Sequence, residues 1–150
     1  MDKIVPKRLF GNTGVEISQL CLGGGSFSVV DGQSLIDKAL EYGVDSWEIV
    51  SFTGKTYCEY FRKHPGIREK VFVSGKVYST DPDIMQKQLD KVLDENGISF
   101  IDFLAVHAID DIKVLTKDVR KWANKAKKQK KIKYFGFCTH KNMDKCSILN

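Results

Sequence analysis

The sequence predicts an α/β fold in which an N-terminal β-hairpin is followed by about five parallel βα units. Short apolar segments rich in β-branched and aromatic residues alternate with amphipathic helical segments along the chain. This alternation favours right-handed βαβ connections and a parallel sheet. No linker rich in proline, glycine or serine divides the 150 residues, so we expect a single domain over residues 1–150.

The hairpin is predicted where the turn-forming residues Gly11-Asn12-Thr13-Gly14 separate two strand-like segments, 8–10 and 15–17. The first strand of the sheet is predicted at Leu20-Cys21-Leu22, and it leads into Gly23-Gly24-Gly25-Ser26. Consecutive glycines let the backbone approach a ligand closely, and they fit a plain flexible turn equally well. Position 28 holds no glycine, so the spacing does not support the G-x-G-x-x-G dinucleotide motif.

Four more strands and four helices follow the first strand. The strands are predicted at 44–50, 71–77, 100–107 and 132–137. A helix is expected to start at Asp81-Pro82, an N-cap followed by proline, and to end at Asn96-Gly97. The residues expected on the buried faces of the four helices are Leu35, Ile36, Ala39, Leu40, Tyr57, Cys58, Phe61, Met85, Leu89, Val92, Leu115, Val119, Trp122 and Ala126. Residues 141–150 are expected to begin a fifth helix.

The composition is that of a globular protein, with 42% hydrophobic and 29% charged residues. No apolar run approaches the roughly 20 residues that span a bilayer, and the N-terminus has no signal-peptide core. We therefore expect a cytoplasmic protein without a membrane segment. Four scattered cysteines form no C-x-x-C pair, which favours reduced thiols and predicts neither disulfides nor a metal site.

The net charge of +5 is partly local, because seven lysines and no acid lie between Lys121 and Lys133. Such a run is found both in nucleic-acid patches and on solvated helix faces. No arginine is interleaved for bidentate contacts with bases, so a solvated helix face is favoured and no nucleic-acid partner is expected.

Candidate functional residues fall at the predicted carboxyl ends of the strands, where parallel α/β folds bind their ligands. These residues are Gly24, Gly25, Ser26, Glu48, Lys76, His107, Cys138, Thr139 and His140. An acid, a lysine and a histidine at successive strand ends can tune a neighbouring proton donor. Two alternatives stay open: a structural ion pair across the mouth of the sheet, and a histidine that is merely hydrogen-bonded at its strand end.

Six segments in order resemble the N-terminal part of the aldo-keto reductase family. They are Arg8–Ser18, Leu22–Gly25, Gly43–Glu48, Val71–Lys76, Phe103–His107 and Lys130–Met143. The resemblance implies roughly strands 1 to 5 of a (β/α)8 barrel of the TIM type, with the hairpin at its base. It also implies NADPH-dependent reduction of a small aldehyde or ketone.

The resemblance assigns roles residue by residue. Lys76 matches the family lysine, His107 matches the histidine that orients the carbonyl, and Glu48 stands at the aspartate position. Thr53 stands at the position of the catalytic tyrosine, and its hydroxyl is a poor acid near neutral pH. Tyr57 is expected to face the core.

The resemblance also suggests residues that bind NADPH. Cys138 and Thr139 correspond to contacts with the nicotinamide carboxamide, and Gly25 and Ser26 to further contacts with the cofactor. The later strands and loops of the family pattern have no counterpart among the 150 residues, so the first and fifth strands are expected to be open edges that favour self-association.

Two functions are compatible with these expectations. The first is an NADP-dependent oxidoreductase domain that is impaired by Thr53 and by the lack of the C-terminal half barrel. The second is a non-catalytic, truncated relative that acts as a protein-interaction scaffold. The sequence does not predict which carbonyl compound would be the substrate.

Overall fold

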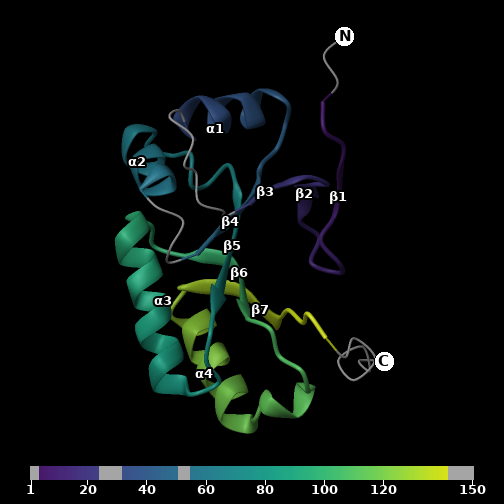
Figure 1. The fold of residues 1–150 in the computed structure, drawn as a ribbon, viewed down its shortest axis with the longest axis vertical. Helices are drawn as coiled ribbons and strands as arrows, with labels where there is room; N and C mark the ends of the chain where they lie inside the picture. Colours follow the sequence, from purple (N-terminus) through teal and green to yellow (C-terminus); the bar gives the residue numbers. More distant parts are fainter. Residues whose placement is uncertain (1–3, 24–31, 51–54, 142–150) are drawn as a thin grey trace.

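The computed structural model describes residues 4–23, 32–50 and 55–141 (Figure 1). Its elements are β1 (Lys7–Leu9), β2 (Glu16–Ser18), β3 (Cys21–Leu22), α1 (Gly32–Glu41), β4 (Ser46–Ile49), α2 (Thr56–Lys63), β5 (Phe72–Val77), α3 (Pro82–Asn96), β6 (Ile101–Val106), the 3-10 helix η1 (Ile112–Val114), α4 (Lys117–Lys128) and β7 (Ile132–Phe137). The predicted order of strands and helices is confirmed, and η1 is an addition to it. The predicted fifth helix lies almost wholly outside the described residues.

Strands β3 to β7 form one parallel sheet whose spatial order follows the chain, β3-β4-β5-β6-β7. Right-handed crossovers in such an order place every connecting helix on the same face of the sheet. Figure 1 shows the helices following the sheet in chain order, with α1 and α2 at one end and α3 and α4 at the other. The predicted α/β class with a parallel sheet is therefore confirmed.

The core lies between the helices and the sheet. Trp47 of β4 is fully buried and its ring contacts the rings of Tyr57, Tyr60 and Phe61 from α2. The predicted helix faces are mostly confirmed, but Leu35 is wrong because it is 40% exposed while its neighbour Ile36 is fully buried. Leu35 instead lines an apolar groove beside the edge strand β3.

The start and end of α3 confirm the capping prediction. The Asp81 carboxylate accepts hydrogen bonds from the backbone N–H groups of Asp83 and Ile84, at 2.9 and 3.0 Å. At the other end, Gly97 adopts a left-handed conformation with φ of 62°, which a residue without Cβ adopts at little cost. These caps fix the two ends of α3, the helix that connects β5 to β6.

The hairpin β1-β2 packs against the face of the sheet opposite the helices, near the amino-terminal ends of the strands. Its turn brings Phe10 against Phe72, Phe103 and Tyr134, with ring centroids 5.0, 5.3 and 6.0 Å apart. Phe103 precedes the core residue Leu104 in β6, so the alternation of side chains along a strand directs it away from the helices. The hairpin therefore covers the amino-terminal end of the sheet and does not cover the carboxyl ends of the strands.

A buried charge network joins β5, β6 and β7 near this base. The Arg68 guanidinium lies 2.7 Å from an Asp102 carboxylate oxygen, and Lys133 lies 2.7 Å from the other oxygen. The same carboxylate accepts a hydrogen bond from the backbone N–H of Val73 at 2.9 Å. This network satisfies a carboxylate that burial alone would destabilise.

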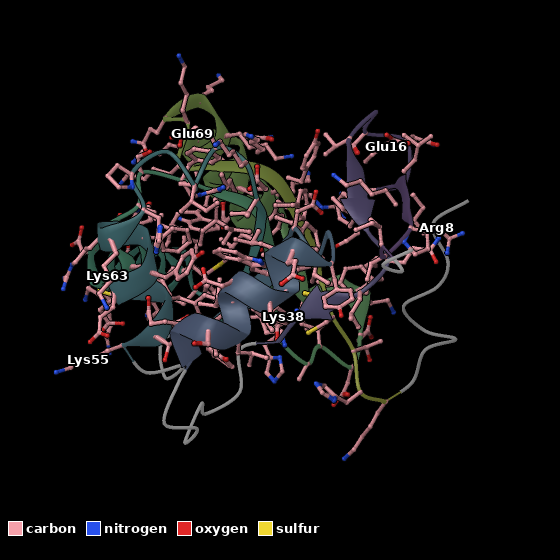
Figure 2. All side chains as sticks on the ribbon, turned by 90° about the horizontal axis from the view of Figure 1, so that it is seen from above. Arg8, Glu16, Lys38, Lys55, Lys63 and Glu69 are labelled. Carbon is pink, nitrogen blue, oxygen red and sulfur yellow. The ribbon has the colours of Figure 1, made fainter. Side chains whose placement is uncertain are left out.

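Other charged side chains point outward from the molecule, as Figure 2 shows for Lys55, Lys63 and Glu69 at its periphery. The lysines of α4 are exposed, and the helix buries Val119 and Trp122. No helix within the described ranges is long and apolar enough to cross a lipid bilayer.

Candidate functional site at the carboxyl ends of the strands

The structure brings three of the predicted catalytic residues to one edge of the sheet. Glu48 lies near the end of β4, Lys76 near the end of β5, and His107 directly after β6. Their chain neighbours Ile49, Val77 and Val106 belong to the core, so the alternation along each strand directs Glu48, Lys76 and His107 to the face opposite the helices. The predicted residues Thr53, Gly24, Gly25 and Ser26 lie outside the described residues.

Glu48 and Lys76 form an ion pair between neighbouring strands. The Lys76 Nζ atom lies 2.9 Å from Oε1 of Glu48, and the two side chains are 22% and 32% exposed. Burial lowers the pKa of Lys76, but the hydrogen bond and charge of Glu48 outweigh it and leave that pKa above its ordinary value. Lys76 is therefore a cation throughout the physiological pH range.

His107 is held at the site by the backbone. Its N–H donates to the carbonyl of Val77 at 2.8 Å, which continues the pairing of β5 with β6 by one residue. Burial, the charge of Lys76 and the nearby His140 lower the pKa of His107 below its ordinary value. A neutral imidazole is thus favoured near pH 7, and one ring nitrogen donates while the other accepts.

Cys138 lies beside His107 at the end of β7. Its Sγ atom is 3.3 Å from Nδ1 of the imidazole, and the backbone N–H of Ala108 donates to the sulfur at 3.4 Å. Ala108 has a positive φ of 52°, which is uncommon for a residue with a side chain and often marks a functional site. Because Nδ1 faces the sulfur, Nε2 is the imidazole nitrogen left to face a ligand.

Two aromatic rings flank His107. Tyr78 and His140 meet it edge-on, with ring centroids 4.9 and 5.0 Å away. Sequence reasoning missed Tyr78, although its position two residues after Lys76 places both side chains on one face of the chain. Burial raises the pKa of Tyr78 while Lys76 lowers it, and the result is above the ordinary value, so the phenol carries its proton at neutral pH.

Thr139 and Tyr57 both have other structural partners. The Thr139 hydroxyl donates to the Lys141 carbonyl and accepts a hydrogen bond from the Lys141 N–H at 3.3 Å. The hydroxyl of Tyr57 lies 3.1 Å from the Leu22 carbonyl oxygen and 3.0 Å from that of Gly23, and the side chain is fully buried. The prediction that Tyr57 faces the core is confirmed.

The arrangement can therefore bind and polarise an oxygen atom. It combines a cation, a neutral imidazole and a phenol at the carboxyl edge of a parallel sheet, where ligands bind in such folds. The acid of Glu48 holds the cation in place and partly balances its charge.

Comparisons with known proteins show which solved structures share this fold. No family model matches the chain, and no curated protein matches it. Many solved structures match the chain; two of them are proposed aldo-keto reductases from Pseudomonas aeruginosa, with TM-scores of 0.75 and 0.76 and 19% sequence identity. Each match covers 89% of this chain, which spans 59% and 60% of the length of the matched chains. The chain therefore has the fold of aldo-keto reductase barrels over somewhat more than half of their length.

Proposed function

We propose that this chain supplies the carbonyl-binding part of an aldo-keto reductase-type active site. The reaction would be the NADPH-dependent reduction of a small aldehyde or ketone. The observation that carries the proposal is the Lys76–Glu48 pair at 2.9 Å, at the same edge of the sheet as His107 and on the same face. The fold likeness supports the choice of reaction class.

The residues have separate tasks in this reaction. Nε2 of His107 donates a hydrogen bond to the carbonyl oxygen, because Nδ1 faces Cys138. The Lys76 ammonium stabilises the negative charge that develops on the oxygen. The phenol of Tyr78 is the proton donor that we propose, since it contacts the His107 ring and keeps its proton at neutral pH.

The described residues fit the carbonyl better than the cofactor. The sulfur of Cys138 contacts His107 and Ala108, and the hydroxyl of Thr139 is bonded to Lys141, so neither is available to the nicotinamide carboxamide without rearrangement. NADPH would supply the hydride. The free thiols of Cys21, Cys58 and Cys138 suit the reducing cytoplasm, which is the location we propose.

The proposal is tested by cofactor binding and by turnover. Purified protein with a folded far-ultraviolet circular dichroism spectrum is titrated with NADPH while the cofactor fluorescence is followed. The same preparation is then assayed with a panel of aliphatic and aromatic aldehydes by NADPH consumption. We expect binding and slow turnover; folded protein that shows neither would rule the proposal out.

A second candidate function is a scaffold that associates through the edges of its sheet. In the described part of the chain, β3 and β7 each pair with one neighbour, and an apolar groove lined by Leu20, Leu22 and Leu35 runs beside β3. Unpaired strand edges are templates for pairing with another chain. Sedimentation equilibrium tests this candidate, which predicts a concentration-dependent dimer; a monomer at all concentrations would exclude self-association.

A further inference from the structure

Three side chains that bind transition metals meet at the ends of β6 and β7. His107, Cys138 and His140 each offer one ligand atom, and the three atoms lie within 4.8 Å of one another. The sequence predicts no metal site because it contains no C-x-x-C pair, but His107 and Cys138 lie 31 residues apart in the chain, each just after a different strand. The cluster is visible only after the strands are paired.

The backbone holds two of the three ligands in place. The Cys138 N–H donates to the carbonyl of Val106 at 2.9 Å, and the Ile109 N–H donates to the Cys138 carbonyl at 3.0 Å. These bonds continue the β6–β7 pairing on both sides of the cluster. His140 follows Cys138 by two residues and is exposed, so its ring can turn toward an ion without disturbing the core.

The sulfur also has the support that metal-bound thiolates need. The Ala108 N–H donates to Sγ of Cys138 at 3.4 Å, from a backbone with φ of 52°. Hydrogen bonds from neighbouring groups orient metal ligands and tune their affinity. The unusual conformation of Ala108 is therefore explained if the sulfur beside it carries negative charge.

The geometry points to a binding site for Zn²⁺ formed by Sγ of Cys138 and the imidazoles of His107 and His140. Thiolate and imidazole are the ligands that Zn²⁺ prefers, at about 2.3 and 2.0 Å. A tetrahedral ion at those distances separates a sulfur from a nitrogen by about 3.5 Å. The observed 3.3 Å between Sγ and Nδ1 of His107 is close to that value.

The ligand set selects against metals that prefer oxygen ligands. Mg²⁺ and Ca²⁺ prefer oxygen ligands, and the cluster offers none. Three protein ligands leave a fourth position for water, as in zinc sites that are accessible to solvent. The main alternative is an ordinary hydrogen bond between the thiol and Nδ1 of His107, which needs no ion.

Cobalt spectroscopy tests this site directly. The full chain, untagged and reduced, is titrated with Co²⁺, and Zn²⁺ is then added to displace it. All proteins tested carry Cys146→Ser, so that the Cys146 thiol does not compete with Cys138 for Co²⁺ or Zn²⁺. A tetrahedral site containing a thiolate gives intense visible bands and a sulfur-to-cobalt charge-transfer band in the near ultraviolet, and we expect both.

Variants identify the ligands. Cys138→Ser should abolish the charge-transfer band, and His140→Ala should weaken Zn²⁺ binding by more than the about 10–100-fold that loss of an outer-shell partner costs. The matched controls Cys21→Ser and His64→Ala replace exposed residues of the same types outside the cluster and should bind as the parent does. Absence of the charge-transfer band in the parent, or equal binding by Cys138→Ser and the parent, would overturn the site. This readout does not involve NADPH or an aldehyde, so it stands apart from the proposed reaction.

Discussion

Lys76 Nζ lies 2.9 Å from Oε1 of Glu48 across the β4–β5 boundary, where both side chains are mostly shielded from solvent. The helical pair Lys38–Glu41 is as short, at 2.8 Å, but both of its side chains are 58% exposed. Ion pairs that solvent reaches freely contribute little, and partial burial strengthens the attraction. The two pairs therefore allow a controlled comparison within one chain.

Replacing Glu48 with glutamine should lower the pKa of Lys76. The Glu48 carboxylate contributes most to raising that pKa, and without it the burial that lowers the pKa remains. The measurement is a titration of the Lys76 side chain followed by NMR. Glu41→Gln, in the exposed pair, should leave the Lys76 titration unchanged, and an unchanged pKa in Glu48→Gln would contradict the described pair.

The stability contributed by His107 should depend on pH. Its pKa is lowered in the folded protein, so the unfolded chain binds a proton more readily. The contribution is complete above about pH 6.5, the ordinary value, and is lost as the pH falls through the folded pKa of His107. The free energy of unfolding of the parent relative to His107→Asn should therefore decrease between about pH 8 and about pH 5.

Urea denaturation of both proteins across this range measures that difference. Lys76→Met should raise the pKa of His107, because the positive charge of Lys76 helps to lower that pKa. Lys38→Met, on the distant surface of α1, should leave the pKa of His107 unchanged. A relative stability that is flat with pH would show that His107 titrates as an ordinary surface histidine.

The two tyrosines near the site should respond in opposite ways to loss of their hydroxyls. Tyr57→Phe leaves the carbonyls of Leu22 and Gly23 without this donor, and it should reduce stability by about 1–2 kcal/mol while turnover is kept. Tyr78→Phe changes an exposed ring, so it should leave stability nearly unchanged and reduce kcat by about 10²–10⁴-fold. Denaturation and NADPH consumption are measured on both variants, and equal turnover by Tyr78→Phe and the parent would remove Tyr78 from the reaction.

Asp102→Asn should destabilise the protein by about 3–5 kcal/mol, because it leaves the buried Arg68 guanidinium without its counter-charge. Asp90→Asn is the matched control: it breaks the more exposed Lys131 pair and should cost about 1 kcal/mol or less. Urea denaturation compares the two. Similar small losses in both variants would mean that the buried network contributes no more than a surface pair.

Local patterns sufficed to predict most of the fold. The alternation of strands and helices, the hairpin turn and the Asp81-Pro82 helix start depend on neighbours in sequence, and the structure confirms each. Leu35 was misplaced because the helix periodicity does not show where the sheet ends beneath α1. A groove beside an edge strand has no signature in the helix itself.

The site was less predictable than the fold, because it depends on pairing between strands. The Lys76–Glu48 contact follows from their positions at adjacent strand ends. The contact of Cys138 with His107 depends on the β6–β7 register and on the conformation of Ala108. The β6–β7 register and the conformation of Ala108 cannot be predicted from residue spacing. The hydrogen bond between Asp102 and the Val73 N–H cannot be predicted in that way either.

The most direct test of the proposed carbonyl site is the kcat/KM for an aldehyde, measured with saturating NADPH for the parent, Lys76→Met and Lys38→Met. Lys76 carries the cation at the site, whereas Lys38 lies on the exposed surface of α1. We predict that Lys76→Met loses at least about 10²-fold in kcat/KM and that Lys38→Met equals the parent. Equal values for all three proteins, or a folded parent that consumes no NADPH with any aldehyde, would contradict the account.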